Sequence, residues 1–383
     1  MTELRLEDFC QLLNNNASGY RFSFATDDRL TAFTVPDNVS VCHALYSLWQ
    51  KETNLQVSYE DFQLVLRGTV QGQHIIFSVS PCVIAYGQDG HTPFKVIIKG
   101  DVFEPNEVLR PTLMSDRSVV KFFRNAGGVW VAVKILERTS RGDDAIQKEL
   151  IQNEHLKRLE MGPDCWERIV TMIHHETTPD SQFVVIVMQA FDTDLGSLLD
   201  AEFSQQPPPF STVLWILQEL LKATDCFHKQ NIILNDIKHL NIVLNRDPPK
   251  LAMIDFDGIS IAGPDGTSLT PGNSTLGFAS WESIVSQRGS FKNDVFAIGM
   301  TLFQVITPSK DVVDLPFVTR EDFEPYTYHE KMQTSIVRMR WRMKNYTQEQ
   351  VEVIVRLFAN MVAFAETRWT IPELLEFVQM QLQ

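Results

Sequence analysis

Residues 232–244 read IILNDIKHLNIVL, two apolar runs that enclose a polar loop. The polar positions have a definite spacing, because Lys238 is two residues and Asn241 five residues after Asp236. A short loop held between buried strands is a rigid mount for polar groups. The pattern therefore predicts a site in which Asp236 can accept a proton from an attacking hydroxyl.

A further acidic residue follows this loop. Asp255 lies fourteen residues after Asn241, in the sequence LAMIDFDG at residues 251–258, directly after another apolar run. Mg²⁺ prefers a few carboxylate or amide oxygens together with phosphate oxygens. Asn241 and Asp255 are therefore expected to bind Mg²⁺, which leaves Asp236 as the base.

A lysine stands in the middle of an apolar run upstream, in VAVKIL at residues 131–136. A lysine within a buried strand is costly unless it has a partner or a ligand. Glu149, fifteen residues after Lys134 and inside a helix predicted over 143–159, is a suitable partner. Lys134 would then face the α- and β-phosphates of a nucleotide.

The three segments together resemble the motif set of the protein kinase superfamily, over roughly residues 112–383. The resemblance implies a two-lobed α+β fold, with a β-rich N-lobe, a helical C-lobe and ATP and Mg²⁺ as cofactors. It assigns these roles: Asp236 as catalytic aspartate, Lys238 as a phosphate-contacting lysine, Lys134 on the nucleotide phosphates, Glu149 (or Glu154) as its partner, and Asn241 and Asp255 as metal ligands.

The resemblance extends to other landmarks. It implies that Met188 is the gatekeeper beside the adenine and that Gln189, Ala190 and Phe191 form the hinge. FASWE at residues 278–282 resembles the segment that closes the activation loop, and DVFAIG at 294–299 resembles the start of the central C-lobe helix. Arg368 stands where the family places an arginine that pairs with Glu282, the last residue of FASWE.

Three departures from the family pattern bear on activity. Leu234 and Asn235 replace the usual histidine and arginine. This removes the cation that would pair with a phosphorylated activation loop, so activity is expected not to require phosphorylation of that loop. Asp257 replaces a glycine. The phosphate-covering loop at residues 113–119 contains no glycine, and bulky side chains there would hinder close approach of backbone amides to phosphates.

Periodicity predicts the order of elements in this part of the chain. Strands are expected at 119–123 and 129–135, joined by a hairpin turn with the sequence NAGG at 125–128. Helices are expected at 143–159 and 213–228, a buried strand at 183–188, and mostly helix after residue 290. The loop at 263–277 carries Thr267, Ser268, Thr270, Ser274 and Thr275, which we interpret either as phosphorylation sites or as solvated loop residues.

Residues 1–105 are expected to form a separate, small mixed α/β domain that binds a protein partner, with the kinase-like domain at 112–383. Strands are predicted at 21–24, 31–35, 74–77 and 94–98, and a helix at 41–51. A strand–strand–helix beginning is compatible with a ubiquitin-like fold. An unassigned α+β interaction domain is the alternative.

Composition excludes several classes of protein. The net charge of −14, from 48 acidic and 34 basic residues, argues against a broad nucleic-acid or anionic-membrane surface. No apolar run is long enough to span a membrane, and residues 1–15 lack the basic region followed by an apolar core that is typical of a secretory signal, so none is expected. The five cysteines are scattered without a CxxC pair, which predicts no structural zinc or disulfide and an intracellular location, in the cytoplasm or nucleus.

Three functions follow from these residues. The first is an active Ser/Thr protein kinase that acts on protein substrates. The second is a pseudokinase or nucleotide-binding scaffold, which the missing glycines favour. The third is a small-molecule kinase of the aminoglycoside or choline type, which also spaces Asp and Asn by five residues, although Lys238 and the Glu282–Arg368 pair favour the protein-kinase type.

Overall fold

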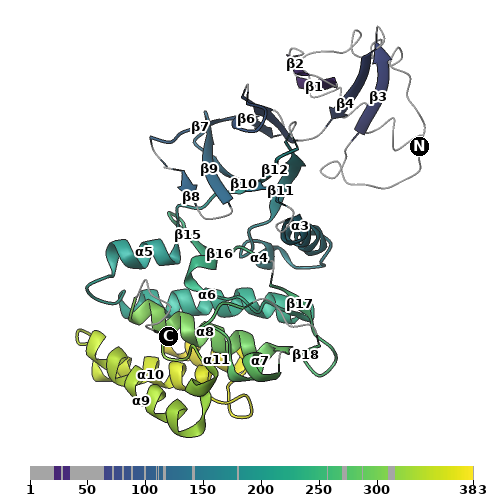
Figure 1. Ribbon diagram of the computed structural model, residues 1–383. Coiled ribbons are helices and arrows are strands. Elements are labelled where there is room, and N and C mark those ends of the chain that lie inside the picture. The colour runs from purple at the N-terminus through teal and green to yellow at the C-terminus, as the bar shows by residue number, and fades with distance from the viewer. Residues whose placement is uncertain are drawn as a thin grey trace. The chain divides into compact units, whose positions relative to one another are not determined.

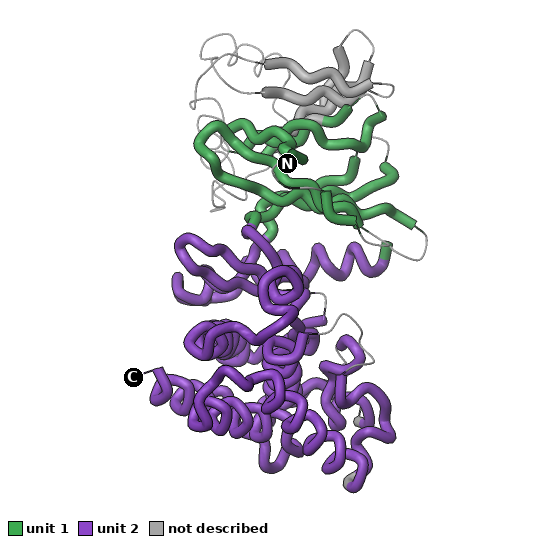
Figure 2. Tube along the Cα trace, turned by 90° about the vertical axis from the view of Figure 1, so that its left-hand side faces the viewer, with its two compact units in different colours: residues 1–143, 172–190 green, residues 144–171, 191–383 purple. Residues whose placement is uncertain are grey.

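The computed structural model describes residues 21–26, 29–34, 64–70, 73–79, 82–87, 89–98, 101–108, 110, 112–114, 118–139, 143–178, 181–256, 258–269, 274–286, 288–308 and 315–382. These residues form two compact units (Figure 2), one of residues 1–143 and 172–190 and the other of residues 144–171 and 191–383. The helix predicted at 41–51 and residues 115–117 of the phosphate-covering loop lie outside the described residues.

The first four strands form an antiparallel sheet in the order β2-β1-β4-β3. Their bounds are β1 Arg21–Thr26, β2 Arg29–Thr34, β3 Leu64–Val70 and β4 Gln73–Val79. The strands predicted near residues 21, 31 and 74 are confirmed, whereas β3 was not predicted. The ubiquitin-like fold stays a prediction.

A second, eight-stranded sheet makes up the rest of the first unit (Figure 1), in the order β11-β12-β10-β9-β7-β6-β5, with β8 also paired to β9. Its strands are β5 Cys82–Tyr86, β6 Pro93–Ile98, β7 Asp101–Pro105, β8 Leu113–Met114, β9 Ser118–Asn125, β10 Trp130–Glu137, β11 Met172–Thr177 and β12 Phe183–Gln189. The predicted hairpin is confirmed, because β9 and β10 pair in register around the turn at 126–129.

This sheet closes on itself. The Tyr86 hydroxyl on β5 donates to Glu176 Oε1 on β11, at 2.6 Å, although β5 and β11 stand at opposite ends of the strand order. Ten buried apolar side chains from β5, β6, β7, β9, β10 and β12 fill the interior. Alternation along β10 directs Val131 and Val133 into this core and Lys134 to the other face.

Strands before the predicted domain boundary belong to the same sheet as strands after it. β7 pairs with one end of β9, with Phe103 opposite Asn125, and β8 pairs with the other end, with Leu113 opposite Val120. The two strands thus share one edge of β9, and residues 106–112 connect them. The boundary at residues 105–112 stays a prediction. The pairing of β7 with β9 places strands from both sides of that boundary in one sheet.

The second unit is mainly helical, as predicted (Figure 1). Its helices are α3 Asp143–Lys157 (Asp143 itself belongs to the first unit), α4 Pro163–Trp166, α5 Leu195–Glu202, α6 Phe210–His228, α7 Trp281–Ser286, α8 Phe291–Ile306, α9 Pro325–Arg342, α10 Gln348–Val362 and α11 Ile371–Gln381, with short 3₁₀ helices at His239–Asn241 and Arg320–Phe323. Helix α8 is buried on all sides from Asn293 to Ile306, as expected of a helix at the centre of a core.

Short strands complete the second unit. β13 Thr193–Asp194, β15 Ile242–Arg246 and β16 Pro249–Met253 form one small sheet. β14 Ile232–Ile233 pairs with β17 Ser260–Ile261, and β18 Thr267–Ser268 pairs with β19 Gly289–Ser290. These pairs hold the polar loop at 234–241 and the segment after Asp255 against the helical core.

One prediction about the cysteines is wrong. Cys165 in α4 and Cys226 in α6 form a disulfide, with Cα atoms 5.7 Å apart. The two residues are 61 positions apart and follow no motif, so only the packing of α4 on α6 brings them together. Among the described helices, none is long and apolar enough to cross a membrane.

Candidate active site

The polar loop forms a compact hydrogen-bonded cluster around the Asp236 carboxylate. Lys238 Nζ lies 2.7 Å from Asp236 Oδ2, and Asn241 Nδ2 donates to the same oxygen at 3.0 Å and to the Asp236 carbonyl at 3.0 Å. Asp236 and Lys238 are mostly buried, and Asn241 is buried. The structure thus brings together three of the predicted site residues, with a cation and an amide both facing the carboxylate of Asp236.

Thr275 belongs to this cluster, although it was predicted only as a loop residue or a phosphorylation site. Its backbone N–H and its hydroxyl both donate to Asp236 Oδ1, at 2.9 and 2.7 Å, and its hydroxyl accepts from Lys238 Nζ at 2.8 Å. Thr275 is half-buried. The hydroxyl therefore connects the Asp236 carboxylate to the loop predicted at 263–277, and only its position shortly before FASWE could have indicated this.

Asp255 stands in a strained turn directly after β16. Its φ is +64°, in the left-handed region that L residues other than Asn and Asp rarely adopt. Ile254 N–H, just before it, donates to the Asn241 carbonyl at 3.0 Å. Asp255 is exposed, and the next residue, Phe256, is buried against Phe227. The backbone therefore links the two predicted metal ligands and leaves the Asp255 carboxylate facing solvent.

Lys134 and Glu149 belong to different compact units. Lys134 is half-buried in the middle of β10, in register with Val120 of β9 and Ile186 of β12. Glu149 is half-buried in α3, where its carbonyl accepts from Asn153 Nδ2 at 2.9 Å. The predicted ion pair between Lys134 and Glu149 stays a prediction.

The predicted gatekeeper and hinge residues lie where the chain passes from the first unit to the second. Met188 and Gln189 end β12, opposite Ala132 and Val131 of β10. The first unit ends at Ala190, and Phe191 opens the next part of the second unit, where it is buried with Lys250 Nζ 5.8 Å from its ring centre. Their contact with adenine stays a prediction.

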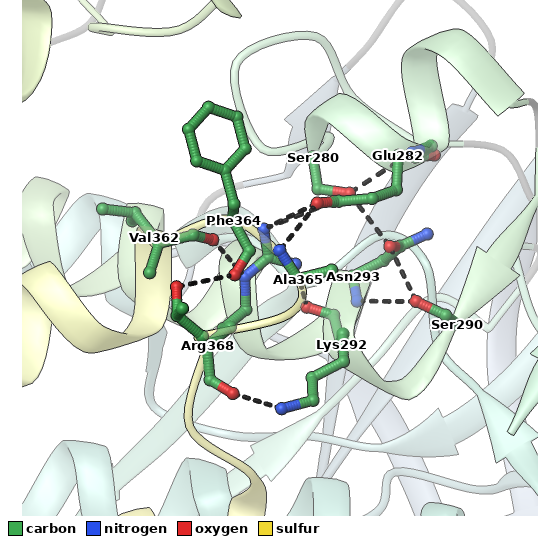
Figure 3. Close-up of polar contacts among 12 residues, drawn as sticks. Ser280, Glu282, Ser290, Lys292, Asn293, Val362, Phe364, Ala365 and Arg368 are labelled. Atoms are coloured by element: carbon green, nitrogen blue, oxygen red, sulfur yellow. Dashed lines mark hydrogen bonds and ion pairs between the residues drawn. The ribbon is translucent and has the colours of Figure 1, made fainter. Parts of the chain in front are cut away.

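The expected Glu282–Arg368 pair is confirmed (Figure 3). Arg368 Nη2 lies 3.3 Å from Glu282 Oε2, and Ala365 N–H donates to Glu282 Oε1 at 3.0 Å. The guanidinium also donates to the carbonyls of Ala363 and Lys292, at 2.8 and 2.7 Å. These contacts anchor α7, where the activation segment ends, to the start of α8 and to the loop before α11.

The pKa values of Glu282 and Arg368 depend on burial and on the charge of the partner residue. Burial raises the pKa of Glu282, but Arg368 and hydrogen bonds, including those from Ser280 and Ala365, lower it more, so the pKa of Glu282 lies below its usual value. Burial lowers the pKa of Arg368, and Glu282 opposes that change. Both groups are charged near neutral pH, which makes the contact an ion pair.

Comparison with known families agrees with this geometry. A family model for the protein kinase domain matches residues 116–378, well over half of the chain. The chain belongs to the protein kinase family. The eight-stranded sheet and the mainly helical unit therefore contain its N-lobe and C-lobe. The polar loop at 234–241, which we predict to be the catalytic loop, lies inside the match.

Several relatives are serine/threonine-protein kinases. The chain is 29% identical over 190 residues to serine/threonine-protein kinase Nek9 of Xenopus laevis, which covers 47% of this chain and 18% of the relative. It is 30% identical over 181 residues to a probable serine/threonine-protein kinase PknB of Lactococcus lactis, a match that covers 46% of this chain and 27% of the relative. It is 27% identical over 151 residues to the probable serine/threonine-protein kinase PBL21 of Arabidopsis thaliana, a match that covers 38% of this chain and 39% of the relative. The match thus spans less than half of each relative.

Proposed function

We propose that this protein transfers the γ-phosphoryl group of ATP to serine or threonine hydroxyls of protein substrates. The observation that carries the proposal is the cluster around Asp236, in which a carboxylate, a lysine, an asparagine and a threonine lie within hydrogen-bond distance. Phosphoryl transfer asks mainly for positioning and for stabilisation of charge, and this cluster supplies both.

In this proposal Asp236 accepts the proton of the attacking hydroxyl. Lys238, 2.7 Å from Asp236, contacts the transferred phosphoryl group and stabilises its negative charge. Thr275 fixes the carboxylate from the activation-segment side. Lys134 binds the α- and β-phosphates, Glu149 orients Lys134, and the backbone at Gln189, Ala190 and Phe191 binds adenine beside Met188.

The donor atoms at the site suit Mg²⁺. The Asn241 nitrogen donates to Asp236, so the amide oxygen is the atom that could bind a cation, and the Asp255 carboxylate is exposed. Mg²⁺ commonly takes one or two protein oxygens and fills its octahedron with water and phosphate oxygens. When bound, the ion would be held by Asn241 and Asp255 and would neutralise negative charge on the nucleotide phosphates.

A catalytically weak pseudokinase is the second candidate. It is favoured by the absence of glycine from residues 113–119, where β8 and β9 flank the phosphate-covering loop. Glycines allow backbone N–H groups to approach phosphates closely, and side chains there weaken that contact. A scaffold of this kind would still bind the nucleotide through Lys134 and the hinge.

Turnover decides between the two candidates. Phosphate incorporation into a mixture of protein substrates should exceed that of Asp255→Ala by at least about a hundredfold, since the variant loses a metal-binding charge near the phosphates. Turnover equal to that of Asp255→Ala, together with intact ATP binding, would support the pseudokinase. Phosphorylation of small alcohols but of no protein would support a small-molecule kinase instead.

Binding of a protein partner by residues 1–105 and the intracellular location stay predictions. The disulfide between Cys165 and Cys226 bears on the location, because oxidising compartments favour disulfides and reducing ones disfavour them.

A further inference from the structure

Position 235, where the family usually has an arginine, carries a buried asparagine with an unusual backbone. Asn235 has φ of +65°, a left-handed conformation that asparagine tolerates better than most residues. Its side-chain nitrogen donates to the Gly258 carbonyl at 2.8 Å and to the Ser260 hydroxyl at 3.0 Å, with a longer contact of 3.3 Å to the Ile233 carbonyl. The amide thus links the catalytic loop to the segment that follows Asp255.

The backbone around Asn235 is fixed from the opposite side. Leu234 N–H and Asn235 N–H donate to the two carboxylate oxygens of Asp294, at 2.9 and 2.8 Å. Asp294 is fully buried near the start of α8 and also pairs with His228, at 2.8 Å. Because α8 is the core helix of the C-lobe, the Asn235 side chain extends from a rigid base.

Both ends of the turn that carries Asp255 are therefore tied to the catalytic loop. On the N-terminal side, Ile254 N–H bonds the Asn241 carbonyl. On the C-terminal side, Gly258 and Ser260 accept from Asn235. Between these ties Asp255 adopts its own left-handed conformation, which a loose turn would not maintain. The position of the Asp255 carboxylate relative to Asp236 thus depends on Asn235.

The surroundings of Asn235 suit a neutral amide and exclude an arginine. A Cβ added to Gly289 would lie 3.0 Å from both Asn235 Oδ1 and Ser260 Oγ, so the space beside the amide is filled. The carbonyl and hydroxyl groups that accept from the amide are uncharged, and the Asp294 carboxylate already accepts two backbone N–H groups. A buried guanidinium here would lack room and a partner, whereas an amide needs neither a phosphate nor a carboxylate.

We propose that Asn235 is a positioning residue that holds the metal-binding turn at Asp255 against the catalytic loop, in place of a contact with a phosphorylated activation segment. The inference rests on the proposed phosphotransfer and names how that site is kept assembled. Asn235 acts through the Gly258 carbonyl and the Ser260 hydroxyl, so its loss should weaken metal binding more than it weakens binding of the protein substrate.

The test uses Asn235→Asp in the full chain. Aspartate keeps the shape and tolerates the left-handed backbone, but it cannot donate to the Gly258 carbonyl. We expect the Mg²⁺ concentration for half-maximal turnover to rise at least tenfold and kcat to fall at least tenfold, with KM for the protein substrate changed less than twofold. Asn360→Asp is the matched control, because the Asn360 amide also donates to a backbone carbonyl, that of Arg356 in α10. It should change none of these values.

Two further variants and one further measurement test the role of Asn235 even if Asn235→Asp fails to fold. Asn235→Gly keeps the backbone permitted and deletes the amide, and Ser260→Ala removes one of its acceptors and should give a smaller shift in the same direction. Hydrogen exchange of the amides in residues 254–262 should quicken at least tenfold in Asn235→Asp and Asn235→Gly but not in Asn360→Asp. This readout requires no turnover.

The outcomes separate the two proposals. A wild-type protein no more active than Asp255→Ala would overturn the phosphotransfer, and the exchange of residues 254–262 would still test the role of Asn235. Unchanged exchange in Asn235→Asp and Asn235→Gly would overturn that role, as would an unchanged Mg²⁺ requirement in an active enzyme. A uniform loss of stability with equal effects on every kinetic constant would also overturn it, since a merely structural asparagine behaves that way.

Discussion

We expect the strands at residues 82–105 to be necessary for folding of the N-lobe, even though they precede the predicted boundary of the kinase domain at residue 112. The perturbation is a chain that begins at residue 112, compared with one that begins at residue 80. In the described structure, β5, β6 and β7 supply four of the ten buried side chains of the N-lobe core, namely Cys82, Ile84, Val96 and Phe103.

The expected loss follows from burial. Burying an isoleucine, valine or phenylalanine side chain contributes roughly 1.5–3 kcal/mol, so the three larger residues contribute about 5–9 kcal/mol together. Removal of the strands also exposes one edge of β9 and the interior faces of β10 and β12. Whole proteins are stable by only about 5–15 kcal/mol, so the truncated N-lobe should not remain folded.

Two point variants in the full chain measure the same effect with less disruption. Phe103→Ala removes a core side chain that is 4% exposed and should lower the free energy of unfolding by about 3–5 kcal/mol. Phe94→Ala is the matched control on the neighbouring β6, because Phe94 is 44% exposed, and it should cost less than about 1 kcal/mol. Urea unfolding followed by circular dichroism and by tryptophan fluorescence gives both values.

A chain starting at residue 112 that unfolds cooperatively at the same urea midpoint as the chain starting at residue 80 would show that the strands at 82–105 are not needed. Equal losses of stability in Phe103→Ala and Phe94→Ala would also contradict this expectation, because burial of the side chain would then make no difference to the free energy of unfolding. Protease resistance of the N-lobe provides an independent check, since an unfolded lobe is cut within its strands.

Three other predictions concern the C-lobe. Thr275→Ala should lower kcat about tenfold or more while Thr275→Ser retains most of it, because serine keeps the side-chain hydroxyl that donates to Asp236 and alanine does not. Steady-state kinetics would show this, and equal kcat values in both variants would contradict it. Glu282→Gln should lower the stability of the protein at pH 7, and the variant should lose less stability than wild type on acidification. The pKa of Glu282 is lower in the folded protein than in the unfolded chain, where it is about 4.3. The ionised carboxylate therefore stabilises the fold above the unfolded pKa, and this stabilisation disappears as pH falls through the folded pKa. Denaturation from pH 7 to 3 measures this, and parallel curves would argue against it. Cys226→Ala, compared with wild type before and after reduction, should lower stability by about 2–4 kcal/mol, and reductant should have no further effect on the variant.

Local patterns predicted much of the kinase fold. The hairpin at 118–137 follows from two β-type runs around a glycine-containing turn, and α6 follows from the spacing of Val213, Leu217 and Leu220. The polar loop was recognisable because charged groups between buried strands are costly and need a reason to be there. Each of these signals lies within about twenty residues, where periodicity is informative.

The features that were missed depend on contacts between distant residues. The pairing of β7 with β9 crosses the predicted domain boundary, and the Tyr86–Glu176 hydrogen bond spans 90 positions. The Cys165–Cys226 disulfide spans 61 positions without any motif. Asn235 appeared only as a missing arginine, because the acceptors that define its role, Gly258 and Ser260, become neighbours only after folding.

The two main departures from the kinase pattern fall in different lobes, so their effects can be separated. The glycine-free segment at 113–119 belongs to the N-lobe unit, where its side chains would weaken phosphate binding and raise KM for ATP. Asn235 belongs to the C-lobe unit, where it would act on the Mg²⁺ requirement and kcat through Asp255. Since the two segments belong to different compact units, substitution of glycines into 113–119 should improve ATP affinity by the same factor in wild type and in Asn235→Asp. Strongly unequal factors would mean that one lobe's departure compensates for the other's.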